Sequence, residues 1–212
     1  GLNWPIAPLK QNKFLHKYGY YECRCKLQKT SGFWCAFWLY CDGAARVNEN
    51  GGRGGAEIDI IESGDFMKKG VNHAIHWNGY GKEYRGITER IYDESLYDGY
   101  HTYALEWTKE VYRFFVDGIC ILETTWGDGV SEVDNEVCVS ICVALNEPED
   151  KTLTGEMIVD YVKIWQKEED IVELAKLQLK ILTTSAKYLK EDGVLFYSTC
   201  TVLRRENDNV VK

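Results

Sequence analysis

Hydrophobic and polar positions alternate along residues 14 to 166, a pattern typical of half-buried β-strands. Gly-rich or charged turns separate the alternating segments, and no convincing helix interrupts them. In FFVDGICIL, Asp117-Gly118 lies between two β-rich runs, which predicts a hairpin. Many strands joined by regular turns predict an antiparallel sandwich. The expected strands span residues 18–27, 33–41, 56–63, 71–77, 100–107, 111–125, 136–145 and 157–166.

The pattern changes near residue 168. An acidic start leads into apolar residues at positions 171, 174, 177 and 181, which is a helical spacing. Gly193 follows as the expected C-cap, and VLFYSTCTV after it predicts a buried strand. A helix that leads into a strand belongs to α/β architecture. We therefore predict two parts, residues 1–167 and residues 168–212.

Composition and charge narrow the function classes. The chain has 212 residues and a formal net charge of -8, which argues against nucleic acid as a partner, because a nucleic-acid surface needs a basic patch. A run of about 18 apolar residues is absent, so no membrane span is expected. No signal peptide is visible, and residue 1 is Gly rather than Met. Seven Trp and fourteen Tyr are many for this length, and such rings line carbohydrate clefts as well as β cores.

Eight cysteines occur without the CxxC spacing of a zinc or redox site. Cys23 and Cys25 alternate with charged residues, so they share the inward face of a strand. VCVSICVAL places Cys138 and Cys142 on one face of another strand. We expect small buried hydrophobic side chains in a reduced chain rather than disulfides. Reduced thiols favour a cytosolic or anaerobic setting.

The stretch GGAEIDIIES, residues 54–63, places three carboxylates on an Ile-rich strand. Charged groups on an apolar strand cost free energy unless they have a use. In a regular strand Glu57 and Asp59 share one face, and Glu62 faces the other way. One extra residue bulged out at Ile60-Ile61 reverses the parity, so that all three carboxylates line one face.

Two glutamates on either side of an aspartate can serve a retaining glycosidase, whose two carboxyl groups lie about 5–5.5 Å apart. Crowded like charges raise the pKa of at least one carboxyl group, which keeps a general acid protonated near neutrality. The alternative is a solvated strand face with unrelated acids. The interleaved Ile residues argue against this alternative, because they occupy one face of the strand and the acids occupy the whole of the other face.

EIDIIE resembles the ExDxxE signature of glycoside hydrolase family 16, in the bulged form of its laminarinase-, agarase- and carrageenase-like branches. KYGYYECRCKLQKTSGFWCAFWLY is similar to the family's strand pair before the active site. YHTYALEWTKEVYRFFVDGICI is similar to a later segment, and GEMIVDYVKIWQ to the closing strand. The match covers residues 14–167. It implies an all-β, concanavalin-like jelly-roll sandwich with a concave cleft, to which the C-terminal helix–strand segment is appended.

The resemblance also implies roles for individual residues. Glu57 would be the nucleophile that forms the glycosyl-enzyme, Glu62 the general acid/base, and Asp59 would assist between them. Family members are usually secreted and cleave internal β-1,3 or β-1,4 bonds of β-glucans or marine galactans, with retention. The expected partner is a polysaccharide, and we expect no cofactor and no metal in the site.

Five further residues are candidates for the cleft. Trp38 and His76 could equally be core residues, and Arg53 could be a loop charge. If neighbouring strands pair, one of His76 and Trp77 must face the carboxylates. The expected substrate-binding residues are Trp34, Trp38, Arg53, His76 and Trp77.

The chain departs from the family at two places. Only about fourteen residues precede KYGYYE, where family members have additional strands, so we expect an N-terminal truncation that exposes a sheet edge. NENGGRGG lacks the Trp that laminarinases commonly carry just before the motif.

Residues 174–207 resemble the last catalytic segment of the ribosomal RNA cytosine-C5 methyltransferases. In that family YSTCT carries the nucleophilic Cys, which would be Cys200 here. The Gly-rich loop for S-adenosylmethionine, the Pro-Cys motif and a basic surface are not found, so Cys200 is expected to be inert. Three hypotheses follow: an endo-acting β-glycanase, a non-hydrolysing β-glycan-binding module of the same fold, and a fragment of an RNA methyltransferase.

Overall fold

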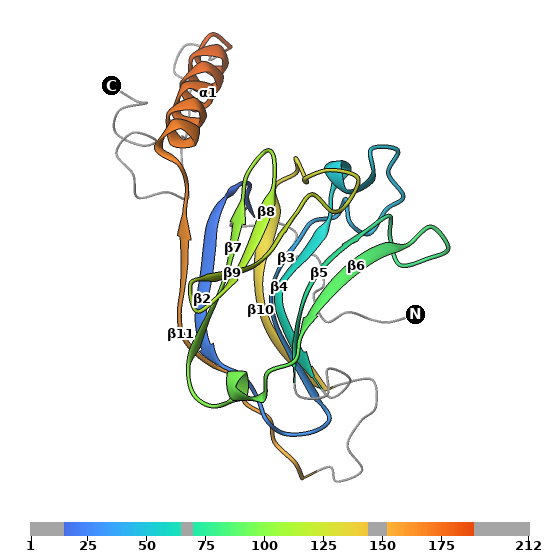
Figure 1. The fold of residues 1–212 in the computed structure, drawn as a ribbon. Coiled ribbons are helices and arrows are strands. Elements are labelled where there is room, and N and C mark those ends of the chain that lie inside the picture. The colour runs from blue at the N-terminus through green and yellow to red at the C-terminus, as the bar shows by residue number, and fades with distance from the viewer. Residues whose placement is uncertain (1–14, 65–69, 144–151, 189–212) are drawn as a thin grey trace. The chain divides into compact units, whose positions relative to one another are not determined.

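The computed structural model describes residues 15–64, 70–143 and 152–188. Its strands form two antiparallel sheets, as the alternating pattern predicted (Figure 1). The first sheet has the strand order β1-β10-β3-β4-β5-β6, and the second has the order β11-β2-β7-β8-β9. The strands are β1 (Leu15–His16), β2 (Gly19–Lys26), β3 (Phe33–Tyr40), β4 (Glu57–Gly64), β5 (Val71–Trp77), β6 (Arg85–Ile91), β7 (His101–Trp107), β8 (Tyr112–Val116), β9 (Ile119–Thr124), β10 (Asn135–Val143) and β11 (Ile158–Trp165).

The hydrophobic core lies between the two sheets. Phe37 on β3 and Ile75 on β5 belong to the same buried cluster as Tyr21 on β2 and Phe114 on β8. Each sheet therefore turns one face toward the other, which removes large apolar side chains from water. The other face of the six-stranded sheet remains available for polar side chains.

Two strands were not predicted. β1 has only two residues, and β6 (RGITERI) is polar and exposed along nearly its whole length. A charged edge strand of this kind lacks the apolar alternation that reveals a strand, but its charges hinder unwanted pairing with another chain. The predicted hairpin between β8 and β9 is confirmed. Asp117 and Gly118 have φ angles of 48° and 76°, which a type I′ turn requires.

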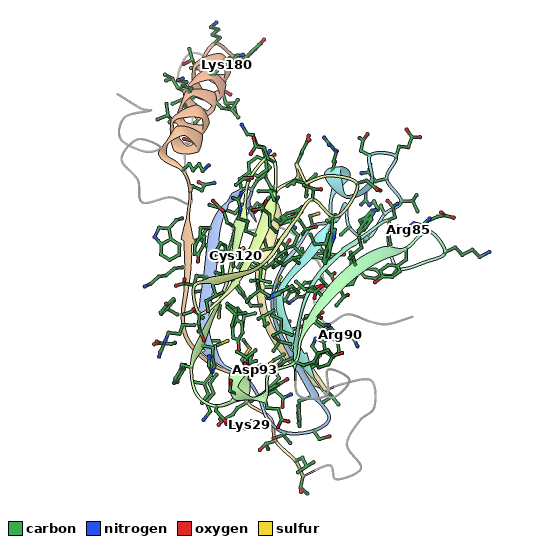
Figure 2. The ribbon with its side chains drawn as sticks, in the orientation of Figure 1. Lys29, Arg85, Arg90, Asp93, Cys120 and Lys180 are labelled. Atoms are coloured by element: carbon green, nitrogen blue, oxygen red, sulfur yellow. The ribbon has the colours of Figure 1, made fainter. Side chains whose placement is uncertain are left out.

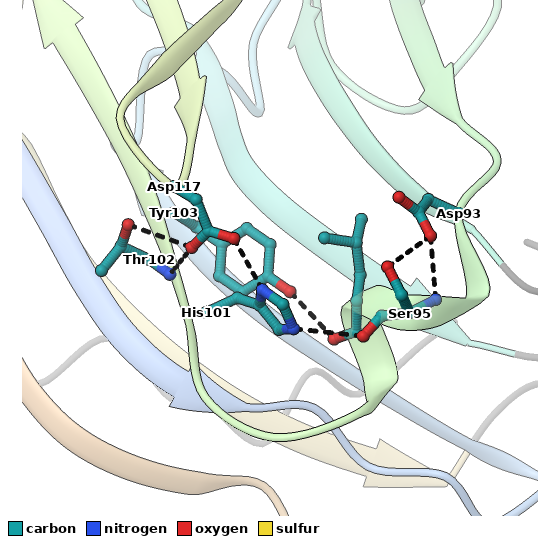
Figure 3. A network of polar contacts seen from close by, with 7 residues as sticks. Asp93, Ser95, His101, Thr102, Tyr103 and Asp117 are labelled. Atoms are coloured by element: carbon teal, nitrogen blue, oxygen red, sulfur yellow. Dashed lines mark hydrogen bonds and ion pairs between the residues drawn. The ribbon is translucent and has the colours of Figure 1, made fainter.

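A polar network links the start of β7 and the β8–β9 turn to the 3₁₀ turn η3 (Glu94–Tyr97) (Figure 3). His101 lies at its centre, with Nδ1 2.7 Å from Asp117 Oδ2 and Nε2 3.1 Å from the Ser95 carbonyl oxygen. The Thr102 backbone N–H donates to Asp117 Oδ1 at 2.8 Å. These bonds join the β8–β9 turn to η3, so the hairpin and the preceding loop hold each other in place.

The chain divides into two units, residues 1–165 and residues 166–212. The second unit contains α1 (Glu168–Ala186), which confirms the predicted helix. The helix ends at Ala186, well before Gly193, where its C-cap was expected. Gly193, the predicted strand after it and Cys200 lie outside the described residues. Among the helices that the structure describes, none has the length and apolar character of a membrane span.

All seven cysteines in the described ranges have free thiols, as predicted. Cys23 and Cys25 are fully buried, and Cys138 is half-buried, but the expected burial is wrong for Cys120 and Cys142, which are exposed. Cys120 is exposed on β9, where Figure 2 labels it. Cys138 and Cys142 share the face of β10 that points away from the core, because they pair with residues of β3 that face the same way.

Candidate active site

A bulge in β4 places the three carboxylates. Between Asp59 and Glu62 the strand has two residues, Ile60 and Ile61, where the neighbouring β5 has one, His73. The register of β4 against β3 shifts by one residue at the same place. The bulge predicted at Ile60-Ile61 is therefore confirmed. It reverses the alternation of side chains once within the strand.

A buried histidine sits opposite the bulge. The Nδ1 atom of His73 lies 2.5 Å from the carbonyl oxygen of Ile60, and its ring lies 5.0 Å from the ring of Phe114 in the opposite sheet. Burial lowers the pKa of His73 to about 4, so the ring is neutral near neutral pH. Its Nδ1–H therefore donates to the carbonyl oxygen that the bulge displaces from the regular ladder.

The bulge separates β4 into an apolar face and an acidic face. Ile58, Ile60 and Ile61 are fully buried and belong to the core cluster. Glu57 pairs with His76, Asp59 with Ala74 and Glu62 with Asn72, which alternate along one face of β5. The acids therefore lie together on the outer face of the sheet, which we call the cleft face. Other positions in register on this face are Trp34, Ala36, Trp38 and Tyr40 on β3, Cys138, Ser140 and Cys142 on β10, and Gly86, Thr88 and Arg90 on β6, of which Figure 2 labels Arg90.

Two aromatic residues after β5 supply polar partners to this cluster. The Tyr80 hydroxyl donates a hydrogen bond to Oε2 of Glu57. The Tyr84 hydroxyl lies 2.6 Å from Nδ1 of His76, whose Nε2 lies 3.2 Å from Oδ2 of Asp59. That last contact has the distance of an ion pair but not the alignment of a hydrogen bond. His76 thus faces the carboxylates, which confirms its predicted place.

Burial is the main cause of the pKa shifts in the cluster. It raises the pKa of Glu57, while the hydrogen bond from Tyr80 and the nearby His76 lower it. Burial, followed by the charge of Glu57, raises the pKa of Asp59 well above its usual range. Burial, followed by the charge of Asp59, raises the pKa of Glu62 well above its usual range. Crowding of like charges was the expected cause, but desolvation is larger, since the sheet shields these groups from water.

The two predicted tryptophans of β3 both lie on the cleft face. Trp38 pairs with Asp59, and its indole N–H donates to Ser140 Oγ at 3.1 Å. Trp34 covers Gly64 closely, so a Cβ atom at residue 64 would lie 2.9 Å from Trp34 Cε3. Both rings are therefore held beside the acids. Their predicted contact with a sugar ring stays a prediction.

Trp77 and Arg53 lie elsewhere. Trp77 faces the core with 5% of its surface exposed, and its indole N–H donates to Asp128 Oδ2 at 3.3 Å. Its predicted place in the cleft is wrong, because the strand alternation gives the cleft face to His76. Arg53, in the 3₁₀ turn η1 (Gly51–Gly54), donates to the Asp128 carbonyl oxygen at 3.1 Å and pairs with Glu132 at 3.4 Å. Its guanidinium thus braces a loop, and no contact in the described structure joins it to the carboxylates.

The same groups have the spacing of metal ligands. One donor atom each from Glu57, Asp59 and His76 lies within 4.8 Å of the others. Two carboxylate oxygens and an imidazole nitrogen are donors that divalent cations accept. Such a set also suits proton transfer and nucleophilic attack, so the geometry alone does not assign it to a metal.

Tyr80, Tyr84 and Asn72 were not predicted from the sequence. The Asn72 side chain forms a hydrogen bond to Glu62 that opposes the rise of its pKa. A signal for the tyrosines exists in HWNGYGKEY, where an Asn-Gly turn follows the strand of His76. A tight turn there folds the next residues back toward the carboxylates.

The sandwich and the C-terminal segment resemble two different protein families. The model of the family described as Glycosyl hydrolases family 16 matches residues 6–163. The model described as 16S rRNA methyltransferase RsmB/F matches residues 157–212. Both resemblances drawn from the sequence are thereby confirmed.

Individual relatives match parts of the chain. The clotting factor G alpha subunit of Tachypleus tridentatus is 28% identical over 71% of this chain and 23% of its own length. The beta-glucanase of Rhodothermus marinus is 35% identical over 47% of this chain and 35% of its own length. The crystal structure of a laminarinase from Flavobacterium sp. UMI-01 has a TM-score of 0.59 at 27% identity, over 74% of this chain and 70% of that one. The chain thus spans about a third or less of these two curated relatives.

Proposed function

Because the chain belongs to glycosyl hydrolases family 16, we propose that its sandwich is the catalytic unit of an endo-acting β-glycanase that retains anomeric configuration. The observation that carries the proposal is the bulge at Ile60-Ile61, which aligns Glu57, Asp59 and Glu62 on one face. A strand without catalytic use gains nothing from three desolvated carboxyl groups side by side.

In the proposed first step, the Glu57 carboxylate attacks the anomeric carbon of the sugar. The bond between that carbon and the glycosidic oxygen breaks, and Glu62 transfers its proton to the leaving oxygen. In the second step a water oxygen attacks the same carbon, Glu62 takes the water proton, and the ester bond to Glu57 breaks. The two inversions together retain the configuration. Desolvation supports the role of Glu62, since burial raises the pKa of its carboxyl group well above the usual range, as a general acid requires.

Asp59 is proposed to assist between the two glutamates. It lies between them on the cleft face and within ion-pair distance of His76. Asp59 is buried and close to Glu57, so the protonation of Asp59 depends on the charge of Glu57. The half-buried Trp34 ring is proposed to stack on a sugar ring. Trp38 has only 6% of its surface exposed, so its ring is proposed to pack beneath the acids, as a core residue would.

The substrate is proposed to be a β-glucan with internal β-1,3 or β-1,4 bonds. The names of the Rhodothermus beta-glucanase and the Flavobacterium laminarinase support this class. The clotting factor subunit has no hydrolase in its name, which keeps a glycan-binding module as the second candidate. Three acids clustered around a bulge favour the hydrolase, because sugar binding alone does not require a desolvated general acid.

The test is reducing-sugar release from laminarin, lichenan, agarose and carrageenan, with Glu57→Gln and Glu62→Gln beside the natural chain. Each variant is expected to lose about 10²- to 10⁴-fold in activity on the polymer that the natural chain cleaves. Glu89→Gln is the matched control, since Glu89 is an exposed acid on β6 of the same sheet.

NMR identifies which anomer is released first and thereby decides the stereochemistry. Initial release of the α-anomer contradicts the retaining mechanism. If the natural chain binds a glycan on the panel without releasing sugar, the binding module is supported instead.

A further inference from the structure

The hairpin between β5 and β6 extends beside the catalytic acids and is anchored at its base. Asn78 and Gly79 adopt left-handed φ angles of 63° and 72°, which turn the chain sharply after β5. The Gly79 N–H donates to the Ala44 carbonyl oxygen at 2.8 Å, and the Asn48 N–H donates to Asn78 Oδ1 at 3.1 Å. The residues that follow are therefore held in a defined position.

Three rings of this hairpin form a row. The rings of Tyr80 and Tyr84 are 6.3 Å apart with an interplanar angle of 22°, and those of Tyr84 and His76 are 5.7 Å apart with the same angle. Gly86, which pairs with His76, leaves room for this row, since a Cβ atom there would lie 2.3 Å from the Tyr84 hydroxyl. Packing along the row restricts the Tyr80 ring, so its hydroxyl is aimed at Glu57.

The contact between Tyr80 and Glu57 has a chemical consequence. Burial and the charge of Glu57 raise the pKa of Tyr80, so the phenol keeps its proton. A neutral donor that bonds to a carboxylate favours the charged form of that carboxylate. Tyr80 therefore opposes the rise in the pKa of Glu57 that burial causes.

Glu62 has a different set of neighbours. Asp59 and Glu57 both raise its pKa, and the opposing partners are His76 and the Asn72 side chain rather than a phenol. The two glutamates thus share one desolvated face, but only Glu57 among them has a tyrosine donor within the described residues. When the surroundings move the pKa values of two carboxyl groups apart in this way, the group with the lower pKa can act as base or nucleophile and the other as acid.

We propose that Tyr80 is a positioning residue that holds Glu57 ionised and directed into the cleft, so that Glu57 and not Glu62 attacks the sugar. The proposal rests on the function proposed above. When the ester to Glu57 forms, the carboxylate loses its charge and the hydrogen bond weakens. When water breaks the ester, the returning charge is met by the same hydroxyl, so Tyr80 assists the second step.

Titration of Glu57 also depends on every group that faces it, and these groups remain unchanged when only the Tyr80 hydroxyl is removed. They are Asp59 and Glu62 on β4, His76 on β5, Tyr40 on β3, Cys138 on β10, and Tyr84 on the hairpin.

The experiment compares the natural chain with Tyr80→Phe and with the control Tyr92→Phe, which removes a hydroxyl from an exposed ring just after β6. The first readout is the ¹³C carboxyl NMR titration of Glu57, assigned by the signal that Glu57→Gln lacks. In Tyr80→Phe, Glu57 is expected to take up its proton at higher pH than in the natural chain. An identical titration in both proteins overturns the proposal.

The second readout is the pH profile of kcat/KM on laminarin and lichenan. Because the attacking group must be ionised, its acid limb should move to higher pH in Tyr80→Phe. Activity on that limb should fall about tenfold, as expected when a hydrogen bond to a charged group is lost. Tyr92→Phe should follow the natural profile. An unmoved acid limb in a folded, active Tyr80→Phe overturns the role in catalysis. If the natural chain cleaves neither glucan, the proposed β-glucan substrate is wrong, and the NMR titration alone decides whether Tyr80 holds Glu57 ionised.

Discussion

The two faces of β4 obey different physical requirements although they alternate along eight residues. On the core face, Ile58, Ile60 and Ile61 are removed from water and stabilise the sandwich. On the cleft face, Glu57 and Glu62 lose hydration without full compensation, as their raised pKa values indicate. One face therefore contributes stability, and the other gives up stability for chemistry.

The bulge is what allows one strand to meet both requirements. Without it, the residue spacing of the acids would turn Glu62 toward the core and one Ile toward the cleft. The His73 ring on the core side donates to the displaced Ile60 carbonyl oxygen, so the core face also fixes the geometry of the cleft face. The cleft face therefore depends on an apolar strand face directly beneath it.

The largest effect is expected from a change in strand length. Insertion of one Ala between Ile61 and Glu62 should remove Glu62 from its place opposite Ala36 and Asn72, because Glu62 turns to the core face if the bulge persists and moves two positions along the cleft face if the strand becomes regular. Either displacement should reduce glycanase activity by about 10²- to 10⁴-fold, which is the loss of a general acid. Deletion of Ile61 should preserve the alignment, because a regular strand then pairs the same acids with the same partners on β3 and β5.

Activity per folded molecule, measured with circular dichroism beside sugar release, checks both variants. The deletion removes a buried side chain, so a loss of about 2–5 kcal/mol in unfolding free energy is expected as well. An active insertion variant, or a folded but inactive deletion variant, would contradict the role given to the bulge.

A smaller effect is expected from His73 on the unfolding free energy as the pH falls. Its pKa is lowered to about 4 in the folded chain, so the unfolded state binds its proton first as the pH falls. The stability that neutral His73 contributes is present above pH 6.5 and is lost as the pH falls from 6.5 toward 4. The loss amounts to about 3 kcal/mol.

Urea unfolding of the natural chain and of His73→Gln between pH 7.5 and pH 4.5 tests this directly. The other titrating groups contribute equally to both unfolding free energies, so the difference between the two proteins reports on His73. The difference should change in favour of His73→Gln as the pH falls. A difference that stays constant with pH would show that His73 is not held neutral.

The smallest effect is expected from Glu62 on the cleft face. Its influence on stability changes with pH in the opposite direction to that of His73. The pKa of Glu62 is raised in the folded chain, so its contribution to stability falls as the pH rises above the ordinary carboxyl range. Glu62→Gln removes this penalty and should stabilise the fold by about 1 kcal/mol near pH 7. The gain should vanish near pH 4, where Glu62 is protonated in both states. Thermal unfolding at the two pH values measures it, and a destabilised variant at pH 7 would show that the Glu62 charge is well compensated.

Local sequence carried most of the fold and the position of the acids. Alternation revealed the strands with apolar faces, and the spacing of Glu57, Asp59 and Glu62 required a bulge that the structure contains. The charged edge strand β6 escaped notice, because its pairing and not its composition makes it a strand.

Other features depend on register, which local sequence does not fix. The choice between His76 and Trp77 follows only from the pairing of β4 with β5. Cys142 was expected to be buried for the same reason, since β10 gives its Cys face to the cleft. Tyr80 lies in a loop whose course depends on contacts with residues 44–48, far away in the sequence.

The bulge has a consequence for how such sites diverge in evolution. Residues on either side of it keep their partners on both neighbouring strands whether β4 contains one residue or two opposite His73. The loss of a single codon at this place therefore shortens the spacing of the motif without moving the acids relative to the rest of the sheet. One in-frame deletion can thus give a strand of regular length in which Glu57, Asp59 and Glu62 keep their partners.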